Sequence, residues 1–133
     1  VEVGLDNICA RYDMLAQAVW AAVDAWGQGG PMRLNIADPA TRSHAVTTVE
    51  IGGELGTKMR EWISDKAGLT LGIGLGMNDG RSSDGHFRIA HMGHVNSHMV
   101  LGALGVIESG LQALEIPHGQ GALAAAARIC AKA

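Results

Sequence analysis

The stretch that decides the fold is Gly85-His86-Phe87-Arg88-Ile89-Ala90-His91-Met92-Gly93, in which an arginine interrupts an apolar, strand-like run. The alternation of a strand places Phe87 and Ile89 on one face and Arg88 and Ala90 on the other. A guanidinium is always charged, so burying it without a partner is costly. Its planar fork fits a carboxylate through two hydrogen bonds. Arg88 is therefore predicted to form an internal ion pair or to bind a carboxylate ligand, and spacing alone favours the internal pair.

The sequence on both sides of this stretch predicts alternating helices and strands. Apolar residues at helical spacing predict helices over residues 5–26, 55–67, 97–114 and 122–131. Alternating or β-branched runs predict strands over 32–36, 45–51 and 69–75, in addition to the strand that carries Arg88. The first two strands are expected to pair antiparallel. This order predicts a single α+β domain over residues 1–133, with a small, mostly antiparallel sheet of about four strands and helices packed on one face.

Three details of these helices are specific predictions. The apolar stripe of the first helix is expected to begin with Leu5, Ile8 and Cys9, and the apolar face of the third helix with Met99. Asn96 or Ser97 is expected to cap the third helix, and Gly68 to end the second. In the first helix Asp6 and Asn7 supply only a late cap, which suggests a piece of a longer polypeptide.

Composition excludes several classes of protein. The chain has 133 residues, 47% hydrophobic and 17% charged, with a formal net charge of −3. This balance indicates a folded domain without the basic surface that binds nucleic acid or an anionic membrane. No membrane-spanning stretch or signal sequence is recognisable. The two cysteines, Cys9 and Cys130, favour a reducing, cytoplasmic location, although one long-range disulfide stays open.

Two motifs suggest ligand sites but have simpler structural explanations. The run Gly72-Ile73-Gly74-Leu75-Gly76 has the composition of a phosphate loop, but no helix follows it directly, so close packing of a strand is favoured. His91, His94 and His98 are close enough in sequence to suggest a metal site. No carboxylate stands at ligand spacing, and histidines that cap carbonyls or line a cleft are the favoured interpretation, so no metal is predicted.

The remaining polar candidates do not form a catalytic motif. Asp79, Arg81 and Asp84 lie in a polar loop that is either a solvated hairpin tip or a lid beside Arg88. The three lysines, Lys58, Lys66 and Lys132, fall on predicted helices and are expected to be solvated. By itself the chain thus offers a candidate for anion recognition and no nucleophile.

The run from Phe87 to Asn96, followed by Leu101-Gly102-Ala103-Leu104 and Val106-Ile107-Glu108, closely resembles the C-terminal segment of class V aminotransferases. The serine–glyoxylate and alanine–glyoxylate aminotransferases are the most similar branch. Weaker similarity in order and spacing extends to Ala10-Arg11, Asp38-Pro39, Gly74-Leu75-Gly76 and Ile116-Pro117.

The resemblance implies the C-terminal small domain of a fold-type I enzyme that uses pyridoxal 5′-phosphate. It implies that Arg88 binds the substrate α-carboxylate, which moves the ligand interpretation ahead of the internal ion pair. The full enzyme would be a homodimer and would transfer an amino group from serine or alanine to an oxo acid such as glyoxylate. Ala90 replaces the glycine that is usual in the family, which leaves the choice of substrate open.

The same resemblance places the Schiff-base lysine and the main cofactor contacts in an upstream large domain that this chain lacks. No catalytic residue is therefore assigned here, and the 133 residues alone are expected to be inactive. Two alternatives remain: the small domain of another fold-type I enzyme, such as a lyase or desulfurase, and a non-catalytic binding module.

Overall fold

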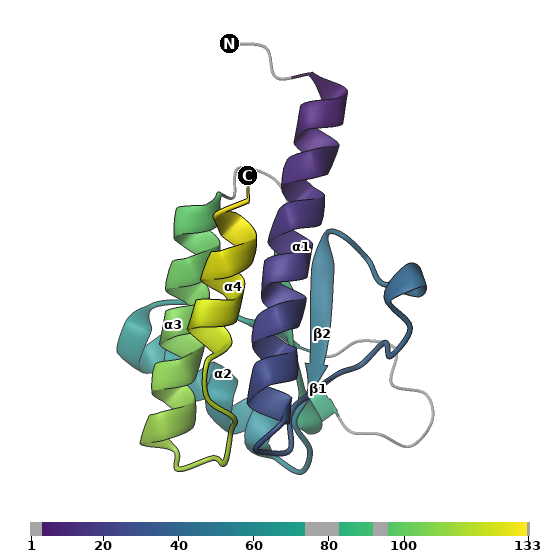
Figure 1. The fold of residues 1–133 in the computed structure, drawn as a ribbon. Helices are drawn as coiled ribbons and strands as arrows, with labels where there is room; N and C mark the ends of the chain where they lie inside the picture. The colour runs from purple at the N-terminus through teal and green to yellow at the C-terminus, as the bar shows by residue number, and fades with distance from the viewer. Residues whose placement is uncertain (1–3, 74–82, 92–95, 133) are drawn as a thin grey trace.

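The computed structural model describes residues 4–73, 83–91 and 96–132, in which four helices accompany one sheet of four strands (Figure 1). The elements follow the order α1 (Leu5–Gly27), β1 (Arg33–Leu34), β2 (Val46–Glu50), α2 (Leu55–Ala67), β3 (Gly72–Ile73), β4 (His86–Ala90), α3 (Ser97–Ala113) and α4 (Ala122–Cys130). Short 3-10 turns occupy Pro39–Thr41 and Ser83–Gly85. The predicted α+β class and element order are confirmed.

The sheet has the strand order β1-β2-β4-β3, and every neighbouring pair is antiparallel. β4 therefore lies between β2 and β3, and Arg88 stands opposite Thr48 on one side and Gly72 on the other. β1 is shorter than the predicted strand over residues 32–36, and β3 begins at Gly72 rather than at residue 69. Beyond β1, the Asn35 N–H still donates to the Thr48 carbonyl at 3.0 Å, so pairing continues as a single bond.

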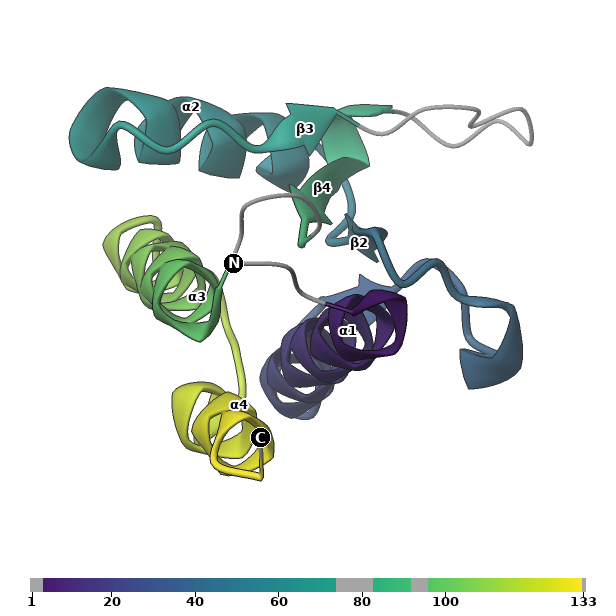
Figure 2. The ribbon, with the colours of Figure 1, turned by 90° about the horizontal axis from the view of Figure 1, so that it is seen from above.

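The helices lie on one face of the sheet, as predicted (Figure 2). α1 contacts β1 and β2, and α2 contacts β3 and β4. α3 packs against α1 and α2, and α4 packs against α1 and α3, away from the strands. Phe87 and Ile89 point from β4 into this layer, where Phe87 is completely buried. Burying a side chain of this size contributes about 1.5–3 kcal/mol, so the inner face of β4 is a major part of the core.

The helix ends follow the sequence signals in two of three cases. The Asn96 side chain accepts a hydrogen bond from the Met99 N–H at 2.9 Å, which makes Asn96 the cap of α3. Gly68 ends α2 in the left-handed conformation at φ 68°, where glycine is the least strained residue. α1 starts directly after Gly4 without a side-chain cap, so neither Asp6 nor Asn7 has the late capping role considered for it.

Two of the apolar stripes begin later than predicted. Leu5 is 74% exposed and Cys9 is exposed, because the first turns of α1 extend beyond the other elements (Figure 1). Met99 is 52% exposed, so the buried face of α3 begins at Val100. The spacing of apolar residues shows which face of a helix is apolar, but it does not show how far along the helix other elements cover that face. Both cysteines are free thiols.

No helix within the described ranges has the length and apolar content needed to cross a membrane.

Gly56 at the start of α2 tests how closely this helix packs on the end of β4. A Cβ at this position would lie 2.6 Å from the Asp84 carbonyl oxygen and from the His86 backbone nitrogen and oxygen. Backbone cannot move away easily, so Gly56→Ala is expected to lower the free energy of unfolding by about 1–3 kcal/mol.

The matched control is Gly102→Ala on α3, where a Cβ meets nothing within 4 Å. This substitution at an exposed helical position is expected to raise the free energy of unfolding by about 0.5–1 kcal/mol. Urea denaturation of both variants measures the difference, and equal effects would contradict the packing argument.

Candidate functional site: Arg88 and the open face of the sheet

Phe87 and Ile89 face the helical layer, so the Arg88 side chain between them extends from the opposite face of β4. This side chain is half-buried. Gly72 on β3 makes room for it. A Cβ on Gly72 would lie 3.2 Å from both Cβ and Nε of Arg88 and 3.3 Å from Nη2. The predicted close packing at this glycine is thus confirmed, and the group that packs there is the arginine itself.

Arg88 separates two cavities. One, of about 330 Å³, lies on the side of β2 and is lined by Trp20, Leu34, Asn35, Ile36, Thr41, Arg42, Ser43, Val46, Thr47, Thr48 and Arg88. The other, of about 210 Å³, lies on the side of β3 and is lined by Val46, Leu69, Thr70, Leu71, Gly72, Arg88, Ile89, Ala90 and Ala103. Ala90 occupies the predicted position on the same face as Arg88, and its methyl group reduces only the second cavity.

A second guanidinium, that of Arg42, lines the larger cavity. It is held firmly: Nε donates to the Ile36 carbonyl at 2.8 Å and Nη2 to the Ala37 carbonyl at 3.0 Å. Its charged carbon lies 5.1 Å from the centre of the Trp20 ring, within cation–π range. Nothing in the sequence indicated a role for Arg42, because it lies within a polar turn segment over residues 38–43, and its contacts with Trp20 and the Ile36 carbonyl form only in the fold.

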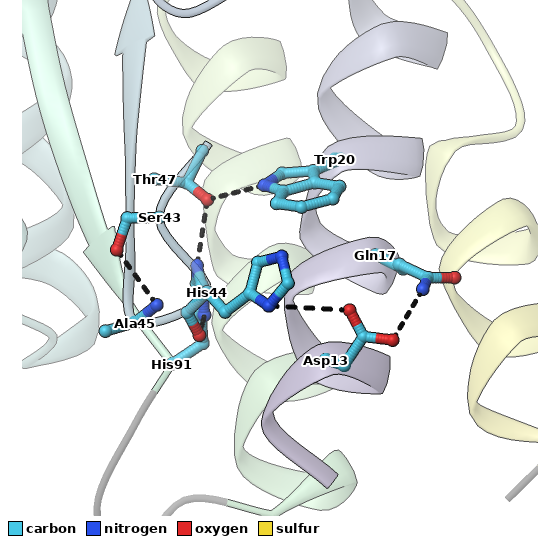
Figure 3. A network of polar contacts seen from close by, with 8 residues as sticks. All are labelled: Asp13, Gln17, Trp20, Ser43, His44, Ala45, Thr47 and His91. Atoms are coloured by element: carbon cyan, nitrogen blue, oxygen red, sulfur yellow. Dashed lines mark hydrogen bonds and ion pairs between the residues drawn. The ribbon is translucent and has the colours of Figure 1, made fainter. Parts of the chain in front are cut away.

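Behind this cavity a buried polar chain connects the sheet to α1 (Figure 3). The Trp20 Nε1–H donates to Thr47 Oγ1 at 3.1 Å, and Thr47 Oγ1 lies 2.8 Å from His91 Nε2. His91 Nδ1 in turn lies 3.1 Å from the His44 carbonyl oxygen. At the exposed end, His44 stands 3.6 Å from Asp13, too long and too solvated for a strong ion pair.

The hydrogen bond to the His44 carbonyl fixes the tautomer of the neutral His91 ring. A carbonyl only accepts, so Nδ1 must carry the proton, and Nε2 then accepts the Thr47 hydroxyl hydrogen. Thr47 Oγ1 at the same time accepts from Trp20, so all three groups are satisfied by a neutral imidazole. His91 is completely buried, and burial lowers the pKa of its imidazole below the usual value despite the opposing hydrogen bond with the His44 carbonyl.

The histidine metal site considered from sequence receives no support. His91 is buried with both ring nitrogens in hydrogen bonds, whereas His98 is exposed on α3 and His94 lies outside the described residues. Within the described ranges no group of three or more metal-binding side chains is placed to hold an ion.

The predicted loop and glycine motifs are described only in part. Asp84 accepts a hydrogen bond from Thr57 Oγ1 at 2.7 Å, which ties it to α2. Asp79 and Arg81 lie outside the described residues, and so do Gly74, Leu75 and Gly76 of the possible phosphate loop.

Lys58, Lys66 and Lys132 are exposed, as predicted, and none lines either cavity beside Arg88. Among the described residues, no lysine amine therefore lies beside Arg88 in a position to form a Schiff base.

Comparisons with known proteins agree with the resemblance found in the sequence. No protein-family model matches the chain. It is 33% identical over 127 residues to serine–glyoxylate aminotransferase of Arabidopsis thaliana, which corresponds to 95% of this chain and 30% of that protein. It is 30% identical over 126 residues to L-aspartate–glyoxylate aminotransferase of Paracoccus denitrificans, covering 94% of this chain and 30% of that protein.

The chain is a homologue of the glyoxylate aminotransferases. The fold agrees with this: the crystal structure of ureidoglycine–glyoxylate aminotransferase from Bacillus subtilis superposes with a TM-score of 0.78 at 28% identity, over 95% of this chain and 31% of that chain. The chain thus spans about a third of the length of the aminotransferases it matches. The family resemblance inferred from the motif around Arg88 is confirmed.

The buried imidazole of His91 predicts how stability depends on pH. Its pKa is lowered in the folded state, so between the usual value near 6.5 and the lowered value the unfolded chain binds more protons. The contribution of His91 is therefore fully present above about pH 6.5 and is lost as pH falls toward the lowered pKa, by at most about 1.4 kcal/mol per pH unit.

Urea denaturation between pH 7.5 and pH 5 measures this slope. His91→Asn is expected to be less stable at pH 7.5, because it breaks the chain to Thr47, and to lose less stability on acidification than the parent. A variant with the same pH slope as the parent would show that another group is responsible.

Proposed function

We propose that this chain is the C-terminal small domain of a longer pyridoxal phosphate-dependent aminotransferase and that it supplies Arg88 to bind the substrate carboxylate. The observation that carries the proposal is the position of Arg88. It is a half-buried guanidinium at the centre of the sheet face that no described helix covers, with a cavity on each side. The homology to glyoxylate aminotransferases supplies the reaction class.

The proposed reaction transfers an amino group from a small amino acid, serine or alanine, to an oxo acid such as glyoxylate. All substrates of this type carry an α-carboxylate, which a guanidinium binds through two parallel hydrogen bonds. Such binding fixes the orientation of the reacting carbon, so part of the entropic barrier is removed before the chemical step. Gly72 supports this role because its missing side chain lets the guanidinium lie across β3.

The described residues of this chain do not fit the covalent role of the cofactor. A Schiff-base lysine must stand beside the substrate site, and Lys58, Lys66 and Lys132 are exposed on or after helices remote from both cavities. In the proposal the cofactor is held by a large domain outside this chain, and the full-length protein acts as a homodimer. The contribution of this chain is recognition of the carboxylate.

Replacement of Arg88 by glutamine in the full-length protein tests the role of the guanidinium. Loss of a buried charge partner costs about 2–5 kcal/mol, so kcat/KM for amino-acid substrates is expected to fall by about thirtyfold or more. Steady-state kinetics with serine or alanine and glyoxylate measure it. The control is Arg128→Gln, which removes an exposed arginine from α4 and is expected to leave kcat/KM unchanged. Unchanged kinetics together with lowered stability in Arg88→Gln would assign Arg88 to an internal structural role.

The second prediction concerns the 133-residue chain by itself. Without a lysine beside Arg88 it is expected to show no transamination above the rate of free pyridoxal phosphate in the same buffer. Formation of hydroxypyruvate from serine and glyoxylate is the measurement. A rate comparable to that of the full-length protein would contradict the proposal that the Schiff-base lysine lies outside this chain.

A further inference from the structure

We infer that Arg42 is a second anion-binding group of the cavity beside Arg88, and that this cavity binds a dicarboxylate more tightly than a monocarboxylate of the same length. This inference rests on the proposed function, since it assigns a ligand group to the same site. It begins from the charge of the larger cavity, whose lining residues include two arginines and no aspartate or glutamate.

The geometry of Arg42 suits a fixed binding group. Its Nε and Nη2 donate to the Ile36 and Ala37 carbonyls, and its Cζ lies 5.1 Å from the centre of the Trp20 ring. These contacts immobilise the side chain before a ligand arrives, so little rotamer entropy is lost on binding. Among the described residues, no hydrogen bond engages Nη1, which leaves donors of this guanidinium for an anion.

A hydrogen bond to the sheet holds Trp20 in place. Its indole N–H donates to Thr47, and Thr47 is held by the buried His91 (Figure 3). The ring that supports Arg42 is thus attached to the core of the sheet, although Arg42 belongs to the loop before β2. A loop guanidinium that is held at three points has a defined position relative to β4.

The remaining wall of the cavity is suited to a short polar ligand. Thr41, Ser43, Thr48 and Asn35 contribute hydroxyl and amide groups, and Leu34 and Ile36 contribute apolar surface. The volume of about 330 Å³ accommodates a four-carbon dicarboxylic acid. Two guanidiniums in one partly enclosed cavity repel each other, and a dianion relieves this repulsion more fully than a monoanion does.

The binding test uses succinate and butyrate, which have four carbons each and differ by one carboxylate. Isothermal titration calorimetry with the full-length, cofactor-loaded protein is expected to show tighter binding of succinate. Arg42→Gln should weaken succinate binding by about tenfold or more, the usual effect of losing a charged hydrogen bond, and leave butyrate unchanged. Arg42→Lys, which keeps the charge, should retain more of the preference than Arg42→Gln.

The matched control is Arg33→Gln, because Arg33 is a surface arginine, 70% exposed, that pairs with Glu50. It removes the same charge from the protein and is expected to leave both affinities unchanged. Equal affinity for succinate and butyrate, an unchanged succinate affinity in Arg42→Gln, or an equal loss in Arg42→Lys and Arg42→Gln would each overturn the inference.

Arg88→Gln separates this inference from the proposed function. If Arg88→Gln abolishes binding of both acids while Arg42→Gln changes neither, Arg88 keeps its role and the Arg42 inference fails. If Arg88→Gln changes neither affinity, the proposed role of Arg88 fails, and a loss of succinate binding in Arg42→Gln would then support an independent anion site at Arg42.

Discussion

The alternation of side chains along β4 is the constraint on which both the core and the candidate site depend. Phe87 and Ile89 enter the helical layer, and Arg88 between them must then point to the uncovered face. A register shift of one residue would place the guanidinium in the core and Phe87 in solvent. Burial of the apolar residues therefore fixes the direction of the charged one. The hydrogen-bonded pairing of β4 with β2 and β3 stabilises the fold and also fixes the direction in which the Arg88 side chain points.

Around that strand, polar contacts connect elements that are far apart in sequence. The chain Trp20–Thr47–His91 joins α1, β2 and the residue after β4, and it is buried enough that each hydrogen bond must be satisfied. A satisfied buried chain of this kind restricts how the helix can sit on the sheet. It also positions the ring on which Arg42 rests, so the loop before β2 is tied to the core through Trp20.

Much of this structure was accessible from the sequence, because local signals and global fold agree. Strand alternation around Arg88, the Asn96 cap and the Gly68 helix end all depend on neighbours within a few residues, and all three were predicted correctly. The exposure of the start of α1 and of Met99 was not predicted, because it depends on whether another element of the fold covers that part of the helix. Arg42 and its contact with Trp20 were missed for a similar reason: the two residues belong to different elements and meet only after folding. The proposed role of Arg88 in carboxylate binding rests on family resemblance, since spacing alone favoured an internal ion pair.

The two cavities beside Arg88 are unequal in volume, and Ala90 lines only one of them. Ala90 lines the cavity on the β3 side, which is the smaller at about 210 Å³. The guanidinium of Arg88 already occupies the space above Gly72 on that side. A ligand that pairs with Arg88 therefore finds more room, and the second positive charge, on the β2 side. On this argument the methyl group of Ala90 does not block the site. It reduces the space on the β3 side, away from Arg42, and leaves the cavity between the two arginines as the larger one.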